Sequence, residues 1–180
     1  MSRLKTIAMV LLLVAADKPL TPHETAARGF AFEGVRLGMT ETALTRAKTT
    51  RRMPQDAMDK TGTYSVLRVE TDAAQSIFAT IYRGQIIRNR VVWDAAATAR
   101  NGGEGNILKL VQAKFGKHHD SAQVKKITEL QWTFAAVERT IELQSDESDD
   151  ETYVRLTITD STAWAAAKKE QAAKIKTGLE

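Results

Sequence analysis

The residues best suited to chemistry in this sequence are the adjacent histidines His118 and His119 and the aspartate that follows them, Asp120. Imidazole nitrogens and carboxylate oxygens bind zinc and can act as general bases. Neighbouring side chains on a strand or helix point apart, so such a run rarely chelates a metal without further ligands. The remaining histidine, His23, lies in a polar segment, and the chain has no cysteine. We therefore expect a solvated loop here and no metal site.

A second candidate is the acidic run from Asp146 to Glu151, whose oxygen ligands suit calcium. It lacks the alternating ligands and the central glycine of a calcium loop. The run is more typical of a charged hairpin tip that keeps a domain in solution, and whether it also binds cations is left open.

Neither cofactor binding nor nucleophilic catalysis is indicated by the remaining motifs. Gly102, Gly103 and Gly105 resemble a phosphate loop only in glycine content, because the Lys-Ser/Thr pair of such a loop is missing. The serines lie in no recognisable nucleophile motif. We expect no catalytic, cofactor-binding or metal-binding residues, and the chain is predicted not to be an enzyme.

Arginines give the clearest candidate for a binding surface. Arg88 and Arg90 alternate within a predicted strand, so both point to one face of the sheet. Burying two unpaired charges would cost several kcal/mol, so this face is expected to be wet or to meet a partner. Ile87, Val91 and Trp93 are expected on the opposite, helix-covered face, where Asn89 would need a hydrogen-bond partner. The predicted partner-binding residues are Arg88, Arg90, Tyr82 and Arg68.

The elements that position these residues are predicted from apolar periodicity. Helices are expected after the N-cap Thr40, from Asn106 to Phe115, and from Ala163 to about Lys176, where Asp160-Ser161-Thr162 forms the cap. Strands are expected at 63–70, 75–82, 85–93, 130–134, 137–143 and 153–158, and a short helix is expected around 55–59. Leu130, Trp132, Phe134, Val154, Leu156 and Ile158 should share one buried face.

This order predicts an α+β fold made of a tandem pair of modules, each with one helix and three antiparallel strands, followed by a C-terminal helix. The expected division is a signal peptide at 1–16, a linker or disordered arm at 17–28, a first module at 29–94, a connector at 95–105, a second module at 106–160 and the last helix at 161–180.

The first residues have the pattern of an export signal. Arg3 and Lys5 precede an uncharged apolar run, and Val14 and Ala16 are the small residues that a signal peptidase reads. The run is about half the roughly 20 residues that a membrane span needs. We expect cleavage near Ala16 and a protein that is periplasmic or extracellular, with no stable membrane insertion afterwards.

The net charge and the absence of cysteine indicate which partner is not expected and how the domain must be stabilised. Cleavage would lower the net charge from +4 to +2, which argues against a nucleic-acid partner. Without cysteine the domain cannot rely on disulfides, so its core must suffice.

The segment 32–40, Phe-Glu-Gly-Val-Arg-Leu-Gly-Met-Thr, resembles the opening of small bacterial envelope proteins, as does the Lys114-Phe115-Gly116 ending of the next helix. Together they resemble the β-lactamase-inhibitor-protein-like group and the small outer-membrane assembly lipoproteins. The resemblance implies helices packed on an antiparallel sheet. The chain lacks both the lipidated cysteine of the lipoproteins and the cysteines of the inhibitor, so neither anchoring nor β-lactamase inhibition is implied.

We therefore expect an exported, non-catalytic protein-binding or envelope-accessory protein whose partner is another envelope or secreted protein. Two alternatives remain: a small hydrolase or metal-dependent enzyme with an unrecognised site, and a structural periplasmic protein without a specific ligand.

Overall fold

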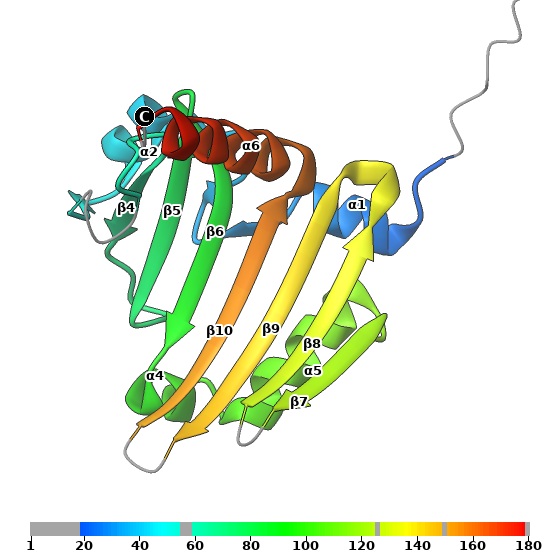
Figure 1. The fold of residues 1–180 in the computed structure, drawn as a ribbon. Coiled ribbons are helices and arrows are strands. Elements are labelled where there is room, and N and C mark those ends of the chain that lie inside the picture. Colours follow the sequence, from blue (N-terminus) through cyan, green and yellow to red (C-terminus); the bar gives the residue numbers. More distant parts are fainter. Residues whose placement is uncertain (1–18, 55–58, 125–126, 149–150, 179–180) are drawn as a thin grey trace, which may run out of the picture.

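The computed structural model describes residues 19–54, 59–124, 127–148 and 151–178, and within these ranges the chain forms an α+β fold around an eight-stranded antiparallel sheet (Figure 1). The strands lie in the order β3-β4-β5-β6-β10-β9-β8-β7. Their bounds are β3 (Thr50–Arg52), β4 (Ser65–Val69), β5 (Ser76–Tyr82), β6 (Gln85–Trp93), β7 (Asp120–Val124), β8 (Ile127–Phe134), β9 (Arg139–Ser148) and β10 (Glu151–Asp160).

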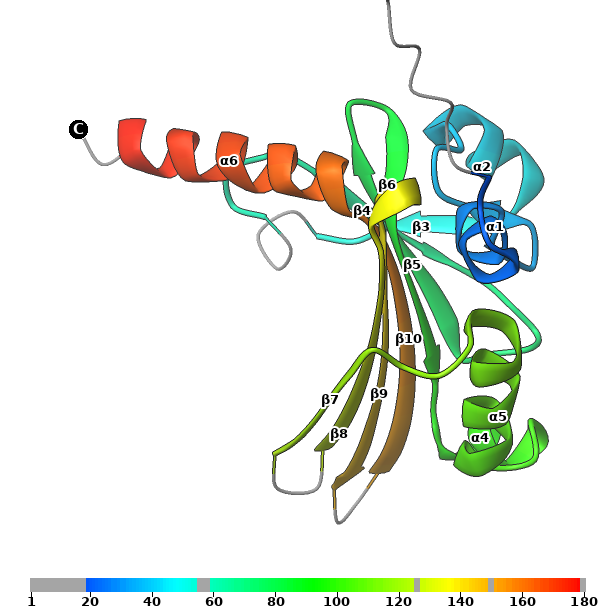
Figure 2. The ribbon, with the colours of Figure 1, turned by 90° about the vertical axis from the view of Figure 1, so that its right-hand side faces the viewer.

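In the described part of the chain, helices α1 (Pro22–Arg28), α2 (Glu41–Ala47), α4 (Ala95–Arg100) and α5 (Glu104–Phe115) and a small hairpin lie on one side of the sheet, and the last helix lies on the other (Figure 2). The hairpin joins β1 (Ala31–Phe32) to β2 (Val35–Arg36). The last helix, α6 (Ser161–Thr177), follows β10, begins at one end of the opposite side and then runs outward from the sheet (Figure 2). We call these two sides the covered face and the open face.

The core lies between the covered face and its helices. Trp132, Phe134, Val154, Leu156 and Ile158 are buried there, and Leu130 packs against them. The predicted buried face of these strands is therefore confirmed. Alternation identified it because each side chain two residues further along a strand returns to the same face.

A β-bulge changes the face of one predicted core residue. The pairing of β5 with β6 shifts between Thr80 and Ile81, which pair with Arg88 and Ile86, so Ile87 is left over. Ile87 packs with Tyr82 and Ala167 under α6 instead of entering the main core, so its predicted position was wrong. A bulge moves side chains across the sheet in this way because it inserts one residue into the alternation.

Val91 and Trp93 do lie in the core, as predicted. Asn89 is buried on the same face and donates from Nδ2 to the carbonyl oxygen of Val35 at 3.4 Å. The hydrogen bond that this buried amide was expected to need is thus present.

Two segments that were expected to be irregular contain helices. The arm predicted at 17–28 contains α1, which begins with a capping box between Thr21 and Glu24. The connector predicted at 95–105 contains α4, for which the Asp94 side chain accepts a hydrogen bond from the Ala97 backbone. The two helices were not expected. Pro22 lies in the first turn of α1, where a missing backbone N–H costs nothing, and the glycines follow the end of α4 at Arg100.

Two short polar strands were also missed, so each half of the sheet has four strands where three were predicted. Those two strands, β3 and β7, form the edges of the sheet. The strands of the two predicted modules lie in one continuous sheet because β6 pairs with β10. Met1–Ala16 and most of the short helix expected around 55–59 lie outside the described residues.

Candidate functional site

On the open face, three directly paired residues, one each from β4, β5 and β6, form a row across the strands. Arg68 pairs with Phe78, and Phe78 pairs with Arg90. Directly paired residues on antiparallel strands share a face and lie about 5 Å apart at Cβ. Two of the predicted partner-binding arginines thus flank one aromatic ring on the open face.

Arg88 lies two residues before Arg90 and is held by neighbours on two elements. Its guanidinium carbon lies 4.9 Å from the centre of the Trp164 ring of α6. Its Nη2 lies 3.7 Å from Oε2 of Glu142 on β9, and 23% of its side chain is exposed. A guanidinium over an indole ring and beside a carboxylate is oriented by both, so Arg88 is fixed in position.

Arg90 is half-buried, and its charge is less well compensated than that of Arg88. Among the described residues, its guanidinium has no ion pair or hydrogen bond. Burial lowers the pKa of Arg90, and the cations of Arg88 and Arg155 lower it further, whereas Glu142 opposes them. Arginine nevertheless stays charged at ordinary pH. The fold has already removed part of the water around the Arg90 guanidinium, so an anion that binds there has less water to displace.

Negative charge gathers on the other half of the open face. Thr157 pairs with both Arg90 and Glu142, which places these two charges on the same row with one strand between them. Arg155 of β10 lies 3.9 Å from Asp146 of β9 between Nη2 and Oδ2. The arginine-rich part of the open face is therefore formed by β4, β5 and β6. Acidic side chains lie further across the same face, on β9.

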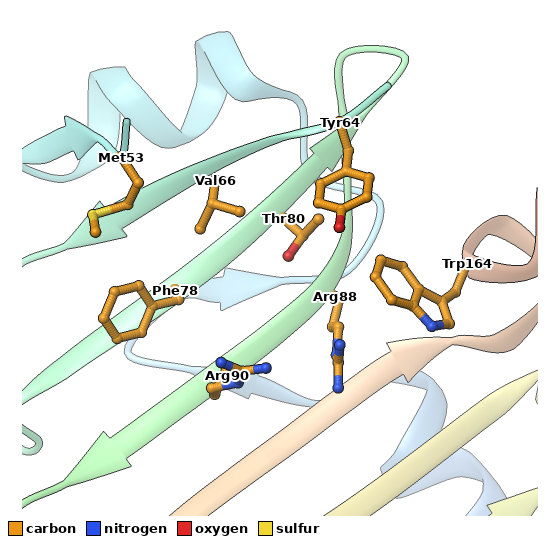
Figure 3. A pocket seen from close by; sticks show the side chains of 8 residues that line it. All are labelled: Met53, Tyr64, Val66, Phe78, Thr80, Arg88, Arg90 and Trp164. Atoms are coloured by element: carbon orange, nitrogen blue, oxygen red, sulfur yellow. The ribbon is translucent and has the colours of Figure 1, made fainter. Parts of the chain in front are cut away.

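A pocket of about 330 Å³ lies at the end of the arginine-rich part, beneath α6 (Figure 3). Figure 3 shows Arg88 and Arg90 along one side, with Trp164 and Phe78 toward the two ends. Apolar and aromatic side chains line most of the rest. The lining residues are Met53, Tyr64, Val66, Phe78, Thr80, Arg88, Arg90 and Trp164.

Two polar contacts fix α6 over this end of the sheet. The Tyr82 hydroxyl donates to Oε2 of Glu170 at 2.9 Å, and burial together with this hydrogen bond raises the pKa of Tyr82. Gln171 Nε2 donates to Oδ1 of Asp59 at 2.8 Å. Trp164, which α6 carries in its first turn, is thereby held against the pocket.

Asp59 joins the same helix to the loop before β4. It accepts hydrogen bonds from the backbone amides of Thr61, Thr63 and Tyr64. Burial raises the pKa of Asp59, but hydrogen bonds led by that of the Thr61 side chain outweigh it and lower the pKa to about 2. Asp59 therefore positions Tyr64, whose ring centre lies 5.6 Å from that of Trp164.

The four predicted partner-binding residues thus divide into two groups. Arg68, Arg88 and Arg90 lie on the open face, whereas Tyr82 is buried and its hydroxyl is engaged by α6. Met53, Tyr64, Phe78 and Trp164, which also line the pocket, were not among the predicted partner-binding residues. The alternation of β5 could have indicated Phe78, because Phe78 is out of phase with the buried Ile77 and Ala79.

The histidine cluster is spread over separate contacts. Nδ1 of His119 accepts a hydrogen bond from the Thr133 amide at 2.9 Å, whereas the ring centres of His118 and Trp132 lie 6.2 Å apart in a T-shaped arrangement. Asp120 begins β7. In the ranges that the structure describes, no group of three or more histidine, aspartate or glutamate side chains is arranged to hold a metal ion.

The acidic run lies mainly in the ends of β9 and β10, as expected for a hairpin, and the turn itself at 149–150 is outside the described residues. None of the helices in the described ranges is long and apolar enough to cross a membrane.

Comparison with known proteins gives no relative: no family model, curated protein or solved structure matches this chain.

Proposed function

We propose that the chain is an exported, non-catalytic binding protein and that the arginine-rich part of its open face receives an acidic protein partner. The observation that carries this proposal is Arg90, a half-buried cation without an ion pair among the described residues. Desolvated charges are costly unless something compensates them. A carboxylate supplied by a partner would provide the missing compensation.

The surroundings of Arg90 also support a partner surface. Arginine and aromatic side chains are enriched where proteins bind one another, and here Phe78 and Trp164 stand beside two arginines. Helices occupy the covered face, so the open face is the large sheet surface left for a partner. His118 and His119 make separate contacts, so they do not support a catalytic function in a comparable way.

Charge reversal tests the proposal. The Arg88→Glu, Arg90→Glu double variant and the wild type would be used to capture partners from extracts of the native cell envelope. We expect the double variant to lose the partner, and the loss to come from a slower, salt-dependent association rate. Because Arg88 also contacts Trp164, the single Arg90→Glu variant would be measured beside it.

Lys109→Glu is the matched control, since it makes the same charge change at an exposed position of α5 on the covered face. Equal capture by the folded Arg90→Glu variant, the control and the wild type would show that the open-face arginines are ordinary solvated surface.

Export, too, remains a proposal, supported by the charged start, the short apolar run and Val14 and Ala16. Intact-mass measurement of the protein made in a bacterial host should give a species that begins at Asp17 outside the cytoplasm. A species that begins at Met1 in the cytosolic fraction would contradict it.

The tandem origin and the envelope-protein resemblance stay proposals as well. The tandem origin is supported by the sheet order, in which β3-β4-β5-β6 meets β10-β9-β8-β7 so that the last strand of each half lies at the centre. The resemblance is supported by the sequence of 32–40 and by Lys114-Phe115-Gly116.

A further inference from the structure

The pocket beneath α6 has two arginine side chains along one side and mainly apolar side chains around the rest. This arrangement suits a small molecule that has one charged group and one apolar part. The pocket's volume of about 330 Å³ lies at the lower end of the range for small-molecule sites. Side chains from the β3–β4 segment, from β4, β5 and β6, and from α6 converge on it (Figure 3).

The charged side would bind an anion in one orientation. Arg88 is held by Trp164 and Glu142, so its guanidinium is fixed before any ligand arrives. Arg90 next to it keeps its guanidinium without an ion pair within the described part of the chain. Hydrogen bonds from guanidinium to carboxylate are short and strong, so a carboxylate beside Arg90 would be well held.

The rest of the pocket favours an apolar body. Val66 is buried on the open side of β4, and the rings of Phe78, Tyr64 and Trp164 line the pocket beside it. The Met53 thioether adds a flexible apolar wall. Glu142 lies close to Arg88, so a second negative charge on the ligand would be repelled.

We propose that this pocket binds a small organic anion with a single carboxylate on an apolar body of about ten carbon atoms. The carboxylate accepts hydrogen bonds from Arg90, and the apolar body lies over Val66 between Phe78 and Trp164. This inference concerns a free small molecule and does not rest on the protein partner proposed above, with whose carboxylate the ligand would compete for Arg90.

The test is titration of the ¹⁵N-labelled protein with decanoate, below its micelle-forming concentration, followed by nuclear magnetic resonance. The three tryptophan indoles report on different places. The Nε1 atoms of Trp93 and Trp132 donate to the backbone carbonyls of Ala73 and Gly116, whereas Trp164 lines the pocket. Saturable movement of the Trp164 indole signal alone is the expected result, and Trp164→Phe assigns that signal.

Isothermal titration then separates the roles of charge and apolar surface. Arg90→Gln should weaken decanoate binding by about tenfold or more, which corresponds to one lost charge-assisted hydrogen bond. Arg90→Lys, which keeps the charge, should lose less, and Lys109→Gln should lose nothing. Decan-1-ol and acetate, which each lack one half of the ligand, should bind far more weakly than decanoate.

Three results would overturn the inference: no saturable binding of decanoate, equal affinity in the folded Arg90→Gln variant, or movement of the Trp93 or Trp132 signal in place of that of Trp164. Because the protein is tested alone, none of these results depends on whether an acidic protein partner exists.

Discussion

The guanidinium of Arg88 lies over the ring of Trp164, so a central strand and the first turn of the last helix meet through a cation–π contact. The contact joins α6 to the open face at the edge of the pocket. It also explains why an arginine can sit on this face with less than a quarter of its side chain exposed.

A double-mutant cycle measures this contact. Arg88→Gln and Trp164→Leu, made singly and together, should show a coupling of about 0.5–1 kcal/mol in the free energy of unfolding by urea. Arg100→Gln is the control partner for Trp164→Leu, since Arg100 is exposed on α4 and lies on the other side of the sheet. Additive effects for the Arg88 pair would show that the stacking adds nothing to stability.

Arg90 is expected to weaken the fold that carries it. Burial and the nearby cations lower its pKa, which means that its environment disfavours the charge. Arg90→Met removes that charge and keeps the bulk, so we expect stability to rise by about 1 kcal/mol and the midpoint of thermal unfolding to rise by a few degrees. Arg100→Met is the matched control, with little expected change. A clear fall in the midpoint for Arg90→Met would assign this arginine a structural role instead.

The low pKa of Asp59 predicts that the stability of the fold depends on pH. Its pKa in the folded protein is about 2, below the ordinary value of 3.8, so the ionised form favours folding. The stabilisation is complete above the unfolded pKa and is lost as the pH falls from about 5 toward 2. Asp59→Asn should therefore cost about 2 kcal/mol at pH 7 and almost nothing near pH 2.

Urea unfolding of the wild type and Asp59→Asn at several pH values gives this difference directly. Asp72→Asn, at an exposed aspartate before β5, is the control and should have a small effect at every pH. A difference that stays constant with pH would mean that the carboxylate charge of Asp59 does not stabilise the fold.

Much of the sheet follows from periodicity because burial on one face imposes a two-residue alternation. Trp132, Phe134 and Ile158 were placed correctly on that basis alone. The edge strands β3 and β7 were missed because they are short and polar and bury little. The helix α1 was signalled by Thr21 and Glu24, which have the spacing of a capping box, and by Pro22 in its first turn, but the segment is polar and has no apolar period.

The site was only partly predictable for a different reason. Alternation placed Arg88 and Arg90 on one face, but it could not indicate the bulge that moves Ile87 to the same side. The side of the sheet on which α6 lies depends on long-range contacts such as Tyr82 with Glu170 and Asp59 with Gln171. Local sequence does not encode such contacts, so the pocket itself could not be foreseen.

Trp132 provides a test of the predicted core. It is fully buried, and its Nε1 donates to the Gly116 carbonyl at 2.9 Å. Trp132→Ala should cost on the order of 3–5 kcal/mol in the free energy of unfolding, because it leaves a cavity. Trp164→Ala, at a half-buried position on the open face, should cost less than half as much. Wild-type stability in Trp132→Ala would show that the register of β8 is wrong.

Site-specific photo-crosslinking in the native host can show whether the protein meets its partner through the open face. A photoreactive amino acid would replace Gln144, which pairs with Arg155 on the open face, or Lys109, which is exposed on α5. We predict one discrete crosslinked protein from position 144, lost when Arg90 is also changed to glutamate, and none from position 109. Crosslinking of the same protein from position 109 but not from position 144 would place the partner on the covered face instead.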